Sequence, residues 1–365
     1  MASELIFQRL SLACRYISGV FMIVFVMCMA FFASFLLTRA IRRYALTVQL
    51  LDIPNDRSSH KNPTPRGGGL AFVLIFTSLI AFLSQTSLVS IPFAIATSGA
   101  GLFVALLGFI DDRRHLSPKI RFSGHFLASA FVLYCCGSFP SIQIGSWLIS
   151  SGWILNGIGV FYLAWVLNLF NFMDGIDGLA ASETIFACIA AASLYWLLGY
   201  SSEILPLIGL AATVSGFLIW NFPPARIFMG DVGSGFLGIV LGAFSIHAAF
   251  LSPSLFWSWL ILLGVFVVDS TITLIQRALS GERVWEAHCT HAYQHASRHY
   301  GGHCPVTLGV TVINITWLLP WAFISCFNWV SGFICCLIAY LPLIFLAFLF
   351  NAGKSSRIGS AKSAC

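Results

Sequence analysis

The stretch GVFYLAWVLNLFNFMDGIDGLA, residues 159–180, joins an apolar run to a group of polar side chains. Polar groups in or beside lipid are costly unless they are bound, so the stretch indicates a membrane helix that ends in a site. Asn168, Asn171 and Asp174 follow at three-residue spacing and share one end of the expected helix. The glycines of DGIDG then allow the backbone to turn sharply and to approach a ligand closely. We expect this end of the helix to line a polar site at the membrane surface.

The composition places the whole chain in a membrane. Of its 365 residues, 58% are hydrophobic and only 9% are charged. Apolar windows of about 20 residues, the length that crosses the hydrocarbon core, recur along it. We expect an all-α integral membrane protein in which residues 1–365 form one multi-span domain with a short tail at 351–365. About eleven transmembrane helices are predicted. The expected spans are 17–38, 69–85, 89–110, 122–138, 149–171, 179–199, 204–220, 232–251, 254–276, 306–327 and 330–350.

The positive charges divide the loops into two sets. Apart from Arg9 and Arg15, which precede the first span, every Lys and Arg lies in a loop after an odd-numbered span or in the C-terminal tail. By the positive-inside rule these loops and the C-terminus are cytoplasmic, and the N-terminus is periplasmic. Most acidic residues lie in or beside the same loops, so we expect the site on the cytoplasmic face. The simpler alternative is a solvated face whose basic residues anchor anionic lipid.

The motif GFIDDRRHLSPKIR, residues 108–121, ends the third expected span. Adjacent Asp111 and Asp112 cannot face the same way on a helix, so we expect them to have different tasks. Two neighbouring carboxylates raise each other's pKa, which favours a bound cation or a role as a base. The alternative is a charge cluster that ends the helix and is neutralised by Arg113 and Arg114.

Two further motifs are the stretch DGIDG, residues 174–178, which presents oxygen ligands, and a later stretch that is expected to begin a phosphate-binding helix. Asp174 and Asp177 offer hard oxygen ligands of the kind that Mg²⁺ prefers. The motif NFPPARIFMGDVGSGFLG, residues 221–238, places Asp231 among glycines where a helix is expected to begin and where free N–H groups bind phosphate. Phe228 in the same motif offers a planar face for a base. Glycine spacing alone often marks helix packing in membranes, but the flanking Asn and Asp favour a binding site.

Two loops complete the set of motifs. The loop NDRSSHKNPTPRGGG, residues 55–69, is basic and ends in glycines, which suits it to bind phosphate oxygens. The loop EAHCTHAYQHASRHYGGHC, residues 286–304, is rich in histidine. Its spacings match no standard closed zinc site, so zinc is the less favoured interpretation. The histidines predicted to share one helical face are His288, His291, His295 and His299.

The aspartate pair, the pattern N-x-x-N-x-x-D-G-x-D-G, the motif F-M-G-D-x-G-S and the late histidine loop occur in this order from about Asp52 to His299. This set resembles the bacterial polyprenyl-phosphate N-acetylhexosamine-1-phosphate transferases. The resemblance implies transfer of a sugar 1-phosphate from a UDP-sugar to undecaprenyl phosphate, with Mg²⁺ (or Mn²⁺ in its place) and release of UMP. It implies a multi-pass catalytic domain in the bacterial inner membrane, with the lipid bilayer as a partner and no nucleic acid. It also allows a homodimer.

The resemblance assigns roles to positions that match the family's motifs. The implied catalytic residues are Asp111, Asp112 and His291, and the implied metal ligands are Asp231 and Asp174. The implied substrate-binding residues are Asn168, Asn171, Asp174, Gly175, Asp177, Asn221, Phe228, Lys61 and Arg66.

The late histidine pattern departs from that of the family. After His291, the sequence HAYQ has Tyr293 and Gln294 where the H-x-H-H pattern has histidines. Together with TPRGGG, this is more similar to the branch that initiates O-antigen and handles 6-deoxy N-acetylhexosamines. The expected donor is therefore UDP-linked N-acetylfucosamine or N-acetylquinovosamine, and the expected pathway is lipopolysaccharide synthesis. UDP-N-acetylglucosamine is the alternative donor within the family.

Two other classes of protein use similar residues. An intramembrane prenyltransferase also combines paired aspartates with Mg²⁺, but it would show D-x-x-x-D motifs and lack FMGDVGSG. An ion-coupled transporter would place acids near the middle of its spans, where only Asp269 approaches such a position. We expect Asp269 to be buried against a polar partner on a neighbouring helix.

Overall fold

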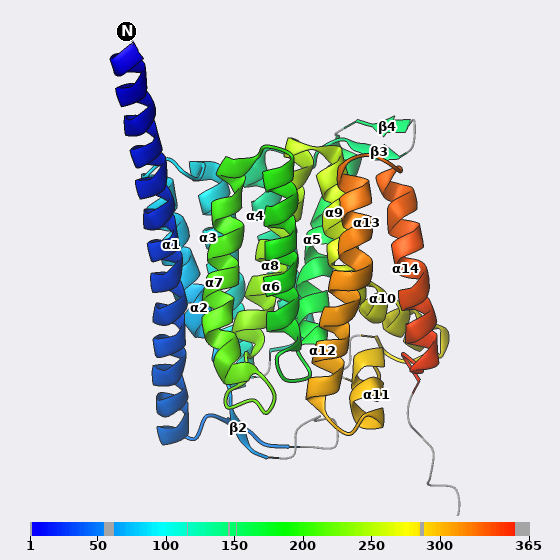
Figure 1. The fold of residues 1–365 in the computed structure, drawn as a ribbon. Helices are drawn as coiled ribbons and strands as arrows, with labels where there is room; N and C mark the ends of the chain where they lie inside the picture. Colours follow the sequence, from blue (N-terminus) through cyan, green and yellow to red (C-terminus); the bar gives the residue numbers. More distant parts are fainter. Residues whose placement is uncertain are drawn as a thin grey trace, which may run out of the picture.

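The computed structural model describes residues 2–54, 62–114, 116–144, 147–150, 152–284 and 288–354, with the side chains of these ranges from Phe21 onward except that of Gln143. In these ranges the chain forms a bundle of helices that run side by side (Figure 1). A short two-stranded antiparallel sheet lies at each end of the bundle. The expected all-α integral membrane protein is confirmed.

The elements follow this order: α1 (Ala2–Thr47), β1 (Leu51–Asp52), β2 (Thr64–Pro65), α2 (Gly69–Gln85), α3 (Ile91–Arg114), α4 (Pro118–Cys136), β3 (Ile142–Ile144), β4 (Trp147–Ile149), α5 (Trp153–Met173), α6 (Leu179–Leu197), the 3₁₀ turn η1 (Ser201–Glu203), α7 (Ile204–Asn221), α8 (Asp231–Leu251), α9 (Pro253–Leu262), α10 (Gly264–Leu279), α11 (Ala292–His299), α12 (His303–Ile313), the π-helical turn η2 (Asn314–Leu318), α13 (Leu319–Cys326) and α14 (Gly332–Leu349). In the sheets, Leu51 pairs with Pro65 and Ile142 pairs with Ile149.

The local sequence explains where several helices begin and end. Ser117 accepts a hydrogen bond from the Ile120 N–H at the start of α4, where Pro118 occupies the first turn. Gly137, in the left-handed conformation, ends the same helix. Helix α7 ends at Asn221, and Phe222 is extended because the following Pro223 drives it out of the helical conformation.

The helices agree in position with the expected spans, and the length and composition of the helices test how many of them cross the membrane. Among the described residues, eight helices are long and apolar enough to cross a bilayer, or nine if the pair α9–α10 is one span. Every expected span falls on one helix or on consecutive helices. However, α2 has only 17 residues, α4 begins with the charged Lys119 and Arg121, and α9 meets α10 at 66°. A multi-pass protein is therefore shown, while the expected count of eleven is not confirmed.

Helix α8 lies at the centre of the bundle. Most of its side chains are buried, and it packs against α2, α3, α5 and α9. Glycines permit its closest contacts. A Cβ at Gly108 of α3 would overlap the backbone carbonyl of Asp231, and a Cβ at Gly238 would lie 2.6 Å from the Cα of Leu167. These contacts hold the start of α8 against the polar ends of α3 and α5.

The two ends of the bundle carry different elements. Sheet β3–β4 lies at one end, whereas β2, α11 and the loop between α7 and α8 lie at the other (Figure 1). The first residues of α1 and the last of α14 are at opposite ends of the bundle (Figure 1). The end that carries α11 brings together the motifs singled out in the sequence.

Candidate active site

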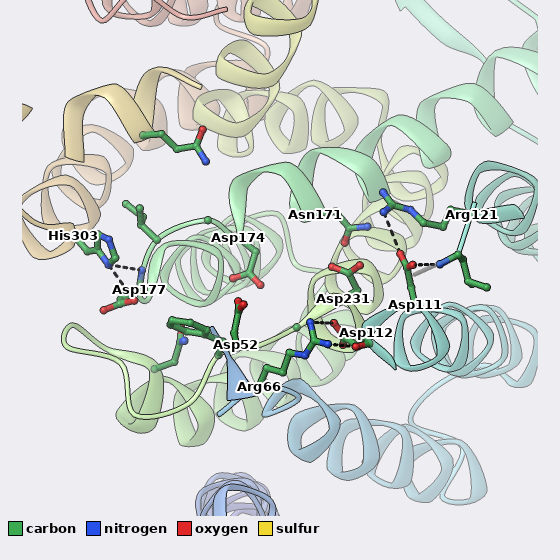
Figure 2. A pocket seen from close by; sticks show the side chains of 17 residues that line it. Asp52, Arg66, Asp111, Asp112, Arg121, Asn171, Asp174, Asp177, Asp231 and His303 are labelled. Atoms are coloured by element: carbon green, nitrogen blue, oxygen red, sulfur yellow. Dashed lines mark hydrogen bonds and ion pairs between the residues drawn. The ribbon is translucent and has the colours of Figure 1, made fainter. Parts of the chain in front are cut away.

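A polar cavity of about 500 Å³ opens at this end of the bundle. Its wall is built from the end of α3, the start of α4, the α5–α6 and α7–α8 loops, α11 and the start of α12 (Figure 2). The lining residues are Asp52, Arg66, Asp111, Asp112, Leu116, Arg121, Asn171, Asp174, Gly175, Ile176, Asp177, Asn221, Phe228, Gly230, Asp231, Gln294 and His303. Most of the site residues expected from the sequence are therefore brought together in one cavity.

Adjacent Asp111 and Asp112 have separate partners, as the helical geometry predicts. Oδ1 of Asp111 accepts the Leu116 N–H at 2.6 Å, and Oδ2 accepts a hydrogen bond from Arg121 at 3.1 Å. Asp112 instead lies beside Arg66, whose guanidinium donates to its backbone carbonyl and lies 3.8 Å from its Oδ1. Oδ2 of Asp112 is buried without a hydrogen-bond partner among the described residues. The pair thus ties two arginines to the cavity wall.

Asp231 is the first residue of α8, as expected from the glycines around it. Gly230 before it has a φ of +75°, a conformation that residues with a side chain rarely adopt. A Cβ at Gly230 would also lie 2.8 Å from Oδ2 of Asp112. Glycine is therefore required both for the turn into α8 and for the approach of α3 to it. This approach places Asp231 beside the aspartate pair (Figure 2).

The two asparagines of α5 have different positions. Asn171 lines the cavity and its Oδ1 accepts a hydrogen bond from Ser234 of α8 at 2.7 Å. Asn168, one turn earlier, is buried and does not line the cavity; its Nδ2 donates to the Ala164 carbonyl at 2.6 Å. A direct contact of Asn168 with substrate is therefore not supported by its place in the fold.

The DGIDG loop is held by hydrogen bonds from two other segments. The carboxylate of Asp177 accepts the Ala225 N–H at 2.9 Å and lies 3.0 Å from Nδ1 of His303. Oδ1 of Asn221 accepts the Gly178 N–H at 3.0 Å, while its Nδ2 donates to the Ile227 carbonyl at 3.0 Å. Asp177 and Asn221 therefore connect the α5–α6 loop to the α7–α8 loop while they line the cavity.

Asp174 stands among other carboxylates. Desolvation raises its pKa well above the usual range, and the nearby carboxylates of Asp231, Asp112 and Asp177 raise it further. Asp52, from the end of β1, faces it across the cavity (Figure 2). A site with such a concentration of carboxylates favours the binding of cations.

The donor set suits a metal that shares its ligands with substrate. Among the described residues, no three His, Cys, Asp or Glu side chains lie close enough to hold a metal ion by themselves. Magnesium is usually bound by one or two carboxylates together with waters and substrate phosphates. Asp231 and Asp174 fit that arrangement. A closed zinc site, which needs four protein ligands, does not fit these residues.

The basic loop and Phe228 contribute the opposite wall. The Phe228 N–H donates to the Pro65 carbonyl at 2.8 Å, and its own carbonyl accepts the Gly68 N–H at 2.9 Å. Phe228 and Arg66 therefore reach the cavity from two paired segments. Lys61, which was expected to bind phosphate, lies outside the described residues.

The histidine loop differs from expectation. A helical face with four histidines is wrong, because α11 begins only at Ala292. Asp269 of α10 accepts the N–H groups of Ala292 and Tyr293, at 3.0 and 2.9 Å, and so caps the start of α11. His291 is buried, with Nδ1 3.2 Å from Oδ1 of Asp269. His291 does not line the cavity. The expected burial of Asp269 against polar groups of a neighbouring helix is confirmed.

The two residues that depart from the family's histidine pattern have defined contacts. The Tyr293 hydroxyl donates to the Phe172 carbonyl at 2.8 Å and lies against Gly175, where a Cβ would overlap it. Gln294 lines the cavity, and its Oε1 accepts the His291 N–H at 3.2 Å. The sequence HAYQ therefore attaches α11 to the end of α5 and presents an amide to the cavity.

Among the charged and titratable residues that line the cavity, three were not expected from the sequence as site residues. Asp52, Arg121 and His303 line the cavity. Arg121 could have been found from its position one helical turn inside α4, ten residues from Asp111. Asp52 precedes the basic loop, and His303 lies near the end of the histidine-rich loop. Only the packing of β1 and α12 brings these two residues to the site.

The fold and the cavity define a multi-pass membrane protein with an acidic site at one end of its helix bundle. Residues 94–249 match the family model described as glycosyl transferase family 4. This segment includes Asp111, Asp174 and Asp231 but not the histidine loop.

Individual relatives extend the match. The chain is 31% identical over 255 residues to a probable undecaprenyl-phosphate N-acetylglucosaminyl 1-phosphate transferase of Bacillus subtilis. This match covers 68% of the chain and 70% of the relative. It is 30% identical to the decaprenyl-phosphate N-acetylglucosaminephosphotransferase of Mycolicibacterium smegmatis, over 59% of this chain and 57% of the relative. It is 29% identical to the phospho-N-acetylmuramoyl-pentapeptide-transferase of Moorella thermoacetica, over 62% of this chain and 73% of the relative. The chain belongs to the polyprenyl-phosphate N-acetylhexosamine-1-phosphate transferase family.

Proposed function

We propose that the protein transfers an N-acetylhexosamine 1-phosphate from a UDP-sugar to undecaprenyl phosphate and releases UMP. The observation that carries this proposal is the acidic cavity of about 500 Å³ at one end of a membrane helix bundle, in a chain of this family. A cavity of that volume suits a small-molecule ligand. Its place at the end of the spans lets a water-soluble donor and a lipid phosphate reach the same point.

The charges of the lining support a bound cation. Six aspartates and two arginines line the cavity. An anionic pyrophosphate would be repelled by this lining unless cations accompany it. Mg²⁺ held by Asp231 and Asp174, together with phosphate oxygens and waters, meets this need, and Mn²⁺ would substitute. When bound, the metal neutralises charge on the pyrophosphate and on the departing UMP.

The residues of the chain bind and orient the two substrates. Phe228 offers a ring face to the uracil. Arg66 and Arg121, held by their contacts with Asp112 and Asp111, bind phosphate oxygens. Oδ2 of Asp112, which is buried and has no hydrogen-bond partner among the described residues, orients the acceptor phosphate or takes its last proton.

The chemical step needs no covalent enzyme intermediate. An oxygen of the lipid phosphate attacks the β-phosphorus of the UDP-sugar, and the bond from that phosphorus to the bridging oxygen breaks as UMP leaves. A phosphate monoester is largely ionised near neutral pH, so positioning and charge neutralisation supply most of the catalysis. We therefore favour direct attack over a route through a phosphorylated aspartate.

For the sugar, we propose a 6-deoxy N-acetylhexosamine, N-acetylfucosamine or N-acetylquinovosamine, and a role in initiating lipopolysaccharide O-antigen. The reduced histidine pattern at Tyr293 and Gln294 supports this choice. UDP-N-acetylglucosamine is the second candidate, which is favoured by the names of the relatives in B. subtilis and M. smegmatis.

We also propose that the protein lies in the bacterial inner membrane with this site facing the cytoplasm. The loops at the end of the bundle that holds the cavity carry basic residues, including Arg66, Arg121, Arg226 and Lys354. A cytoplasmic site agrees with the use of a nucleotide sugar.

The decisive experiment incubates membranes that contain the protein with radiolabelled UDP-sugar and undecaprenyl phosphate. We expect label in the organic phase, release of UMP, and neither in membranes that carry Asp231→Asn. If none of the N-acetylhexosamine donors labels the lipid, the proposed reaction is wrong. A prenyltransferase would instead consume a prenyl diphosphate, and a transporter would accumulate its solute without labelling lipid.

A further inference from the structure

Glu183 is a buried acid inside the helix bundle that none of the roles above uses. It lies in the first turns of α6, directly after the DGIDG loop, and is only 1% exposed. Its Oε2 accepts a hydrogen bond of 2.5 Å from Nδ2 of Asn314, the first residue of η2. An ionisable group at such a depth is costly and indicates a functional role.

The remaining oxygens of this pair point to its protonation state. Oε1 of Glu183 and Oδ1 of Asn314 are both buried and have no partner among the described residues. An ionised carboxylate and an amide oxygen are acceptors only, so neither can satisfy the other. One proton on Oε1 supplies the missing donor and completes a two-bond pair of carboxylic acid and primary amide.

We propose that Glu183 is a protonated carboxylic acid, paired with Asn314 through two hydrogen bonds, and that this pair is a positioning device for α12 and for His303 at the cavity. The part that concerns catalysis rests on the proposed function. The part that concerns the pair itself does not.

The position of α12 depends on few contacts. Along this helix only Val306 and Thr307 are buried. The apolar face of the helix, which includes Val306, borders a second cavity of about 250 Å³. The lining of this apolar cavity also includes Gly309, Val310 and Ile313. Close apolar packing therefore does not by itself hold α12 in place.

Polar contacts with α6 and the loop before it hold the helix instead. His303 lies 3.0 Å from the Asp177 carboxylate, Thr307 donates to the Asp177 carbonyl at 2.9 Å, and the Glu183–Asn314 pair follows further along. These contacts form one line from the cavity into the bundle. The pair at its buried end determines how far His303 reaches into the cavity.

The backbone at Asn314 supports a specialised role. Residues 314–318 form a π-helical turn between α12 and α13, just before Pro320, which has no N–H to continue an α-helical ladder. Such turns are rare and often mark functional sites. Here the wider turn places an amide opposite the only acid in α6.

The test compares Glu183→Gln with Glu183→Ala and Asn314→Leu. A glutamine can form the same two bonds with Asn314, so Glu183→Gln should keep kcat and the donor KM. The other two variants should raise the donor KM about fivefold, with a smaller change in kcat. Thr311→Val is the matched control, because it removes only a bond within α12, from Thr311 to the Thr307 carbonyl. If Glu183→Gln is as impaired as Glu183→Ala, the proposal is wrong.

A second measurement does not depend on turnover. The infrared spectrum of the purified protein should contain a band of a protonated carboxylic acid that is absent in Glu183→Gln. Thermal unfolding should separate Glu183→Gln from Asn314→Leu in the same order as the KM values. Absence of the band overturns the proposal even if the enzyme is active. Conversely, failure of every donor would refute the proposed reaction and leave the band as the test of the pair.

Discussion

Asp111 and Asp112 are neighbours in the chain, yet their carboxylates bind different arginines. Asp111 is bound by Arg121 and by the Leu116 N–H, which leaves it little capacity for a substrate. Oδ2 of Asp112, beside Gly230, is buried and has no hydrogen-bond partner in the part of the chain that the structure describes. Of the two, Asp112 is therefore the better candidate for direct contact with the acceptor phosphate.

Asp231→Asn should abolish turnover while the protein is still expressed and inserted. The change removes a charge that we propose binds the metal, at the first residue of α8. The rate of lipid labelling at saturating Mg²⁺ is the measurement. Activity above about a tenth of the wild-type rate, a loss of less than ~1.4 kcal/mol in the barrier, would contradict a direct metal role.

Removal of divalent metal should stop the reaction reversibly. The cavity carries more carboxylates than arginines, so the donor pyrophosphate needs a compensating cation. Chelation followed by stepwise addition of Mg²⁺ or Mn²⁺ should restore lipid labelling, and Ca²⁺ should serve as a comparison. Full activity after exhaustive chelation would exclude the proposed metal.

At the scale of elements, α11 is a short helix held by another helix. Asp269 of α10 accepts two of its first N–H groups and contacts His291 as well. In return, Tyr293 and Gln294 connect α11 to the end of α5 and to the cavity. His291 thus lies outside the cavity and contacts the residue that caps α11.

Asp269→Ala should weaken this arrangement and raise the donor KM. It leaves buried N–H groups without acceptors, at a cost of about 1–3 kcal/mol for each group. The measurements are the melting temperature and the donor KM. Glu203→Gln is the control, because Glu203 contacts His247 of α8 and takes no part in the contacts of Asp269 or α11. An unchanged KM in Asp269→Ala would mean that α11 does not shape the donor site.

At the scale of the whole molecule, the orientation in the membrane is the first question. A reporter fused after residue 200 should behave as periplasmic, and a reporter fused after residue 290 as cytoplasmic. The first fusion point follows the end of α6, and the second precedes α11. The end of α6 and helix α11 lie at opposite ends of the bundle (Figure 1). Two fusions that report the same side would contradict both the proposed topology and a cytoplasmic site.

The choice of sugar is a property of the complete cavity. We expect UDP-linked N-acetylfucosamine or N-acetylquinovosamine to be preferred over N-acetylglucosamine, and all of them over a muramoyl-pentapeptide donor. An apolar pocket discriminates only weakly against an added hydroxyl, so some turnover of N-acetylglucosamine is expected. Competition assays give the ratios of kcat/KM. A preference of tenfold or more for N-acetylglucosamine, about 1.4 kcal/mol, would refute the 6-deoxy sugar.

The sequence by itself determined the features that arise from local order along the chain. The apolar windows predicted helices close to those observed, because a run of apolar residues in lipid must satisfy its backbone hydrogen bonds internally. The glycines around Asp231 predicted the start of α8, and the adjacency of Asp111 and Asp112 predicted that they face different ways.

Tertiary structure alone decided which of these residues meet. Asp52 and His303 line the cavity because β1 and α12 pack beside it. His291 lies outside the cavity, against Asp269, which caps the start of α11 at Ala292. The bend of 66° between α9 and α10 likewise has no local signal in the apolar pattern. The physical reason is that contacts between distant segments depend on packing in three dimensions, which the periodicity of one segment does not encode.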